Sequence, residues 1–152
     1  MTIQTFVLHP RLENDTVFVA DYALSRVLLM NDARFPWLLL VPRRAGICQL
    51  HELAHAERMV LIEEIARAGK ALIAVSAAAK INVAALGNIV PQLHVHVVAR
   101  NASDPAWPNP VWGFGEPIPY SLEARAAATP ESRAVTASCC GAEKSSAFWA
   151  VC

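Results

Sequence analysis

The sequence has few charged residues, and the two signs balance. Charged side chains make up 17% of the 152 residues, and the formal net charge is zero. A chain without a basic excess has no overall field that attracts nucleic acid or an anionic membrane surface. We therefore expect neither as a partner, and only the pair Arg43 and Arg44 forms a local candidate for binding an anion.

Cysteines are also few, and their spacing matches neither a disulfide framework nor a zinc knuckle. No CxxC pair occurs among the four, and three of them lie near the end of the chain: Cys48, Cys139, Cys140 and Cys152. A reducing compartment is the simplest setting for such a chain. We expect a cytoplasmic protein without a metal or other cofactor.

Long apolar runs are missing as well. Residues 1–6 lack the basic start and the apolar core of a signal peptide. The most membrane-like window, 71–90, is interrupted by Lys80, Asn82 and Asn88. A membrane span needs about 18 or more apolar residues with few or no charges. We expect a soluble protein.

What the sequence does contain predicts one α+β domain. Runs rich in leucine, β-branched and aromatic residues predict strands at 16–20, 26–30, 37–41 and 80–86. The run 37–41 is apolar throughout, which is typical of a strand buried on both faces. A fifth strand is expected after residue 90. Antiparallel strands with one long helix across them make the expected architecture.

The helix is predicted from about residue 50 to about residue 78, where the apolar period changes to three or four residues. One predicted apolar stripe joins Met59, Ile62, Ile65, Ala66, Gly69 and Leu72. We expect an irregular or short helical lead-in before the first strand and a second short helix near 122–128. The expected domain covers 1–115, and a partly irregular extension covers 116–152.

The most informative stretch alternates between polar and apolar residues: Gln92-Leu93-His94-Val95-His96-Val97-Val98. Successive side chains of a strand point to opposite faces, so a strand would place the amide and both imidazoles on one face, about 7 Å apart. Such a face can hold an anion or a metal.

A competing pattern is the sequence His51-Glu52-Leu53-Ala54-His55, which fits HExxH. On a helix its two histidines would lie one turn apart, as zinc ligation requires, with Glu52 as the base for a metal-bound water. The longer metzincin pattern needs glycine and histidine where this chain has Arg58 and Leu61. A zinc peptidase is therefore the minor alternative.

The alternating stretch resembles the signature of the histidine triad (HIT) superfamily of nucleotide hydrolases and transferases, His-φ-His-φ-His-φ-φ with φ hydrophobic. Six of its seven positions agree, and Gln92 stands at the first. Other stretches are similar and occur in the expected order: Leu28-Leu29-Met30-Asn31, Leu39-Leu40-Val41-Pro42-Arg43-Arg44 and Gly87-Asn88-Ile89-Val90. The last stands where the family commonly has Gly-Gln-Ser/Thr-Val. The resemblance covers roughly residues 10–115.

The resemblance implies a catalytic set of His94, His96 and Gln92. In the family mechanism the middle imidazole, here His94, attacks the α-phosphorus of a nucleotide anhydride or phosphoramidate and forms a nucleotidyl-histidine. A neutral imidazole is already a competent nucleophile near pH 7. His96 can donate to a phosphate oxygen or to the leaving group. Gln92 keeps hydrogen-bonding capacity but cannot become a cation.

The resemblance also implies a nucleotide-binding set and a homodimer. Asn31 is the expected partner of the ribose hydroxyls, and Asn88 can donate to the phosphate or the leaving group. Backbone N–H groups near Gly87 and Ile89 can add donors.

Three departures from the family pattern carry expectations of their own. Gln92 leaves open a second function, a nucleotide-binding protein without useful turnover. Many members have a histidine that orients the nucleophile after Val-x-Pro-Lys/Arg, whereas Ala45 follows Arg44 here. We therefore expect a backbone carbonyl to orient His94. The segment 104–112, rich in proline and tryptophan, is expected to pack on the domain or to line the pocket.

Overall fold

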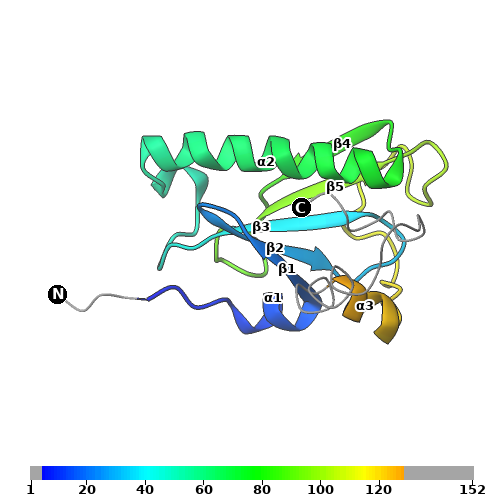
Figure 1. Cartoon of the computed structure of the whole chain (residues 1–152), viewed down its shortest axis with the longest axis horizontal. Helices are drawn as coiled ribbons and strands as arrows, with labels where there is room; N and C mark the ends of the chain where they lie inside the picture. Colours follow the sequence, from blue (N-terminus) through cyan, green and yellow to red (C-terminus); the bar gives the residue numbers. More distant parts are fainter. Residues whose placement is uncertain (1–4, 129–152) are drawn as a thin grey trace, which may run out of the picture.

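A single antiparallel sheet organises the computed structural model, which describes residues 5–128. Its strand order is β1-β2-β3-β5-β4. The long helix α2 lies across one face, and α1 lies on the other side of the sheet (Figure 1). The elements in chain order are α1 (Pro10–Asp15), β1 (Thr16–Asp21), β2 (Ser25–Met30), β3 (Trp37–Pro42), the 3₁₀ turn η1 (Leu50–Glu52), α2 (His55–Ser76), β4 (Lys80–Ala84), β5 (Val95–Arg100) and α3 (Leu122–Ala128).

This architecture confirms the predicted α+β fold of five antiparallel strands and one long helix. The predicted short helices before the first strand and near 122–128 are α1 and α3. Most of the expected C-terminal extension lies outside the described residues, including Cys139, Cys140 and Cys152. Within residues 5–128, no helix is both long and apolar enough to cross a bilayer.

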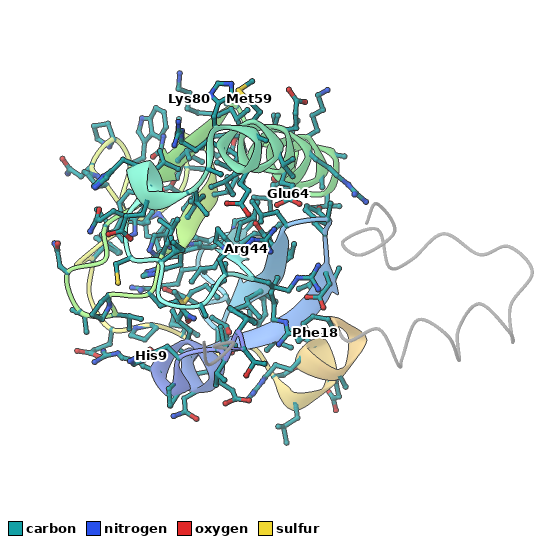
Figure 2. The ribbon with its side chains drawn as sticks, turned by 90° about the vertical axis from the view of Figure 1, so that its left-hand side faces the viewer. His9, Phe18, Arg44, Met59, Glu64 and Lys80 are labelled. Carbon is teal, nitrogen blue, oxygen red and sulfur yellow. The ribbon has the colours of Figure 1, made fainter. Side chains whose placement is uncertain are left out.

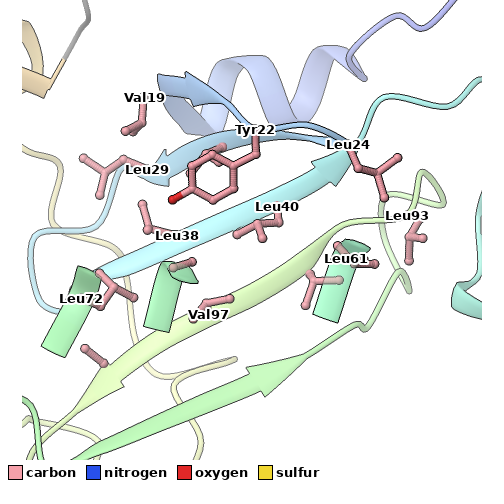
Figure 3. Packing of buried hydrophobic residues seen from close by; sticks show 14 of the residues in the cluster. Val19, Tyr22, Leu24, Leu29, Leu38, Leu40, Leu61, Leu72, Leu93 and Val97 are labelled. Carbon is pink, nitrogen blue, oxygen red and sulfur yellow. The ribbon is translucent and has the colours of Figure 1, made fainter. Parts of the chain in front are cut away.

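The central strand β3 divides the core into two parts. Every residue of β3 is buried, as its unbroken apolar run predicts. Leu38 and Leu40 pack with Val97 in the cluster between the sheet and α2 (Figure 3). Leu39 belongs to the second cluster, on the opposite face, which also contains Trp37. The site forms on this second face.

The predicted apolar stripe of α2 is wrong at Met59, Ile62 and Ala66, which are exposed, and right at Gly69 and Leu72, which are buried. Met59 is 52% exposed and Ile62 is 53% exposed, while Glu64 is buried. The Glu64 carboxylate accepts hydrogen bonds from the backbone N–H groups of Leu24 and Ser25, at 2.7 and 3.1 Å. Figure 2 shows Glu64 on the side of α2 that faces the strands, and Met59 on the outer side. The buried face of α2 is Leu61, Glu64, Ala68, Gly69, Ala71 and Leu72.

A buried guanidinium at the end of β5 holds the segment that follows it. Arg100 is 2% exposed. It donates to both carboxylate oxygens of Asp104, at 2.7 and 3.1 Å, and to the carbonyl oxygen of Asn109 at 2.9 Å. It also donates to the side chain of Asn82 on the neighbouring strand. These bonds fix residues 104–109, which lead directly into one wall of the site.

We predict that Arg100→Met lowers the free energy of unfolding by about 3 kcal/mol, because it leaves the partly buried Asp104 carboxylate without its cation and the Asn109 carbonyl without its donor. Chemical denaturation measures this change. Lys80, which lies opposite Arg100 on β4 and is exposed, supplies the matched control. Lys80→Met should change the stability by about 0.5 kcal/mol or less. Equal effects of the two substitutions would contradict the role given to Arg100.

Candidate functional site

A cavity of about 450 Å³ opens on the face of the sheet opposite α2. Cavities of this size are typical of sites for small molecules. Helix α1, the turn after β2, the loop 86–90 and the segment 111–117 supply its walls. His94 and His96 both line it.

The backbone fixes the tautomer of His94. Its Nδ1 lies 2.7 Å from the carbonyl oxygen of Gln92. A carbonyl only accepts hydrogen bonds, so Nδ1 carries the proton and Nε2 keeps its lone pair. This arrangement confirms the expectation that a backbone carbonyl orients His94. An imidazole held in this way presents an unprotonated nitrogen, which is the form that can act as a nucleophile.

His96 has the opposite tautomer, because the Nε1–H of Trp37 donates to its Nδ1 at 3.0 Å. An indole only donates, so the imidazole proton of His96 is on Nε2. Burial, together with the neighbouring His94, lowers the pKa of His96 to about 4. The ring is therefore a neutral N–H donor at physiological pH. Its centroid lies 4.9 Å from that of His94.

The loop before β5 brings three predicted nucleotide-binding residues to the cavity, namely Gly87, Asn88 and Ile89. Gly87 has φ +70°, a left-handed conformation that strains other residues and that lets the chain turn here. The predicted strands on either side are shorter than expected. β4 ends at Ala84. β5 begins only at Val95, because the N–H of Leu93 donates to the carbonyl oxygen of Ile47, which lies outside the strands.

Gln92 does not share the cavity face with the two histidines, contrary to the alternation argument. It precedes β5, and its side-chain amide hydrogen-bonds to the backbone of Val7 and His9. Among the residues that the structure describes, it is not one that lines the cavity.

Asn31 also lies outside the cavity wall formed by the described residues, although its neighbours Met30 and Asp32 line it. The side-chain oxygen of Asn31 accepts from the N–H of Tyr120 at 3.0 Å. The ribose contact expected of Asn31 stays a prediction, since this bond uses only one acceptor position of its side chain.

The turn after β2 is instead an anchor for the C-terminal wall. Asp32 accepts from the N–H of Ile118, and Ala33 donates to the carbonyl of Ile118. Arg34 pairs with Asp32 at 2.7 Å and donates to the carbonyl of Phe114 at 2.8 Å. These contacts hold residues 114–118 against the rim of the cavity.

The HExxH stretch does not form the helix that zinc ligation requires. His51 and Glu52 belong to the 3₁₀ turn η1, whereas His55 begins α2 after two extended residues. Glu52 accepts hydrogen bonds from the backbone N–H groups of Cys48 and Gln49, and these bonds lower its pKa. Its carboxylate therefore stabilises a turn, and nowhere in residues 5–128 are three His, Cys, Asp or Glu side chains grouped to hold a metal ion.

Two tryptophans belong to the site although the sequence predicts no catalytic contact for them. Trp37 bonds to His96, and Trp112 stacks edge-on against both rings, with centroids 5.9 Å from Trp37 and 5.6 Å from His96. Trp112 thus both packs and lines the pocket. The α1 residues of the wall, Arg11 and Asp15, were not predicted either. Local sequence holds no signal for them, because strand pairing and chain packing bring them here.

Comparison with known proteins gives a consistent result. The model of the HIT domain family matches residues 11–103. A histidine triad protein from Bradyrhizobium japonicum is 43% identical, with 82% of this chain and 96% of that chain covered and a TM-score of 0.77. One from Sinorhizobium meliloti is 45% identical, with 87% and 93% covered and a TM-score of 0.77. One from Marinobacter aquaeolei is 44% identical, with 82% and 90% covered and a TM-score of 0.79. No curated protein matches.

Fold and site together define a small α+β protein with two histidines of opposite tautomer in a cavity for a small molecule. The chain belongs to the HIT family.

We predict that His96 makes stability depend on pH. The pKa of His96 is about 4 in the folded protein, whereas the ordinary pKa of histidine, which applies to the unfolded chain, is 6.5. Between these two pH values the unfolded chain therefore binds more protons than the folded protein. Stability therefore rises with pH through this window, and the full gap corresponds to about 3 kcal/mol.

The check compares urea denaturation of the wild type and of His96→Gln at pH 4.5 and pH 7. The loss of stability on acidification should be smaller in the variant by about 2 kcal/mol or more, since its side chain does not titrate. Equal losses in the two proteins would show that His96 is not held neutral.

Proposed function

We propose that the chain hydrolyses nucleotide phosphoanhydrides or phosphoramidates at the α-phosphate, through a nucleotidyl-histidine intermediate on His94. The observation that carries this proposal is the bond between His94 Nδ1 and the Gln92 carbonyl, which leaves Nε2 unprotonated in a residue that lines the cavity. Membership of the HIT family supports the same chemistry.

In the first step, Nε2 of His94 forms a bond to the α-phosphorus while the bond from phosphorus to the leaving oxygen or nitrogen breaks. The departing group takes its proton from solvent. In the second step, water attacks phosphorus, the bond to Nε2 breaks, and the nucleoside monophosphate leaves as the imidazole regains its lone pair. The attacking water gives up its proton to solvent.

His96 supports both steps as a donor and not as an acid. Its Nε2–H is available because Trp37 occupies Nδ1, and its pKa of about 4 keeps the ring neutral. A fixed N–H donor stabilises the negative charge that develops on the phosphate oxygens. Asn88, in the wall of the same cavity, can supply a second donor to the phosphate or the leaving group.

The decisive experiment is to trap the adduct. Incubation with an adenosine 5′-phosphoramidate or a diadenosine polyphosphate should release AMP, and acid-free mass spectrometry should detect the nucleotidyl protein. His94→Ala should abolish the adduct and lower turnover by about a thousandfold or more, because the nucleophile is gone.

His51→Ala is the matched control, since it removes an exposed histidine outside the cavity wall and should leave turnover unchanged. An adduct that persists in His94→Ala would overturn the mechanism. Binding of AMP without any turnover by the wild type would favour the nucleotide-binding module over the hydrolase.

We also propose that the chain forms a homodimer through β4. This strand is an edge of the sheet and pairs only with β5 among the described elements. Val83 on β4 is 50% exposed. An open edge with apolar side chains favours pairing with a second chain.

Val83→Lys should shift the protein towards monomer by about tenfold or more in dissociation constant, because it places a charge at the proposed contact. Sedimentation velocity over a range of concentrations measures this shift. Leu122→Lys, at an apolar residue of α3 that is still more exposed and lies away from β4, is the control and should leave the mass unchanged. A wild type that sediments as a monomer at every concentration would exclude the dimer.

A further inference from the structure

The side chain of Gln92 holds the chain that leads into α1. Its Oε1 accepts from the backbone N–H of His9 at 2.9 Å, and its Nε2 donates to the carbonyl oxygen of Val7 at 2.8 Å. In an extended segment, the carbonyl of one residue and the N–H two positions later point to the same side. The amide therefore pairs with this segment as a strand would, through two hydrogen bonds at once.

The anchored residues position a wall of the cavity. His9 is the N-cap of α1, and its own Nδ1 accepts from the N–H of Arg11 (Figure 2 shows His9 beside this helix). Arg11, Leu12 and Asp15 of α1 line the cavity. The far end of α1 is tied to the sheet, since the N–H of Asn31 donates to the carbonyl of Asp15. Gln92 thus holds the N-terminal end of α1.

The main chain of the same residue orients the nucleophile, because the Gln92 carbonyl accepts from Nδ1 of His94 at 2.7 Å. We propose that Gln92 is a positioning residue that couples the α1 wall to His94, and that it is not a weakened substitute for a catalytic histidine. This inference rests on the proposed function. In that function, Gln92 fixes the position of the α1 wall of the cavity relative to His94.

A histidine at this position cannot make the same contacts. The amide oxygen and nitrogen of glutamine both lie at the far end of the side chain, where each meets one of two neighbouring backbone groups. In an imidazole, Nδ1 lies next to the carbon that joins the ring to the chain and Nε2 lies farther out, so one histidine reaches only one of these groups. Completing the triad signature by Gln92→His should therefore impair the enzyme, although the motif alone suggests an improvement.

The kinetic test separates the two roles of Gln92. Gln92→Ala, which loses both hydrogen bonds, should raise KM about tenfold, because the N-terminal end of α1 is no longer held in place. Gln92→His, which keeps at most one of the two bonds, should raise KM by about threefold or more. Both variants keep the backbone carbonyl that orients His94, so kcat should change by about twofold or less. A rise in kcat/KM for Gln92→His, or an unchanged KM for Gln92→Ala, would overturn the proposal.

A pair of substitutions at His9 isolates one of the two bonds. His9 has φ −62°, a value that proline adopts, so His9→Pro removes the N–H donor and keeps the φ of this position. His9→Ala loses the same cap to Arg11 but keeps the N–H. His9→Pro should have a KM about fivefold higher than His9→Ala, which corresponds to one hydrogen bond. Equal KM values would show that the bond to Gln92 does not position the wall.

Amide hydrogen exchange tests, without any substrate, whether the hydrogen bond between Gln92 and His9 is present. The His9 amide should exchange at least about tenfold faster in Gln92→Ala than in the wild type, because its acceptor is lost. In Gln92→His, which can keep one of the two bonds, the exchange rate should be faster than in the wild type but no faster than in Gln92→Ala. The amides of β3, in the buried core, serve as the reference for intact folding. Unchanged exchange at His9 would overturn the anchor. Failure of the wild type to bind or cleave nucleotides, with faster exchange in the variants, would instead overturn the proposed function alone.

Discussion

The pairing of β3 with β5 is the contact on which the whole site depends. It places Leu39 opposite His96 and Trp37 opposite Val98. Because side chains alternate along each strand, this register sends Val97 and Leu38 into the core beneath α2, and His96 and Trp37 to the cavity face. A slip of one residue would exchange the two faces and bury an imidazole under α2. The hydrogen bond between Trp37 and His96, which joins residues 59 positions apart, exists only in this register.

The strands and the pair of histidines in the cavity could be predicted from sequence because their signals are local. Leucine and β-branched runs bounded by turn residues identify β1, β2 and β3 within about one residue. The alternation through His94 and His96 places both on one face, and both line the cavity. The family resemblance added the loop at Gly87. The absence of a histidine after Arg44 even predicted the carbonyl that orients His94.

The remaining features depend on backbone groups that a local pattern cannot show. Glu64 is buried because the N–H groups of Leu24 and Ser25, in a distant turn, satisfy its carboxylate, and this rotates α2 away from the predicted stripe. In the sequence, Gln92 occupies an alternating polar position together with His94 and His96. β5 begins only at Val95, however, so the alternation of a strand does not place the Gln92 side chain on the cavity face. The hydrogen-bond partners of Gln92 lie more than 80 residues away along the chain. The same is true of the Tyr120 N–H, which donates to the side chain of Asn31.

The turn after β2 holds the rim of the cavity through contacts that are separate from those that hold the two imidazoles. Its hydrogen bonds secure residues 114–118, which lie beyond the stretch 11–103 that the family model covers. Residues 114–117 supply part of the cavity wall, whereas the two imidazoles are held by the sheet, by the Gln92 carbonyl and by contacts with Trp37 and Trp112. Loops on a rigid scaffold tolerate replacement. The rim formed by residues 114–118 is thus an exchangeable module, and grafting the corresponding loop from a relative onto this sheet would reshape the cavity while leaving His94, His96 and Trp112 in place.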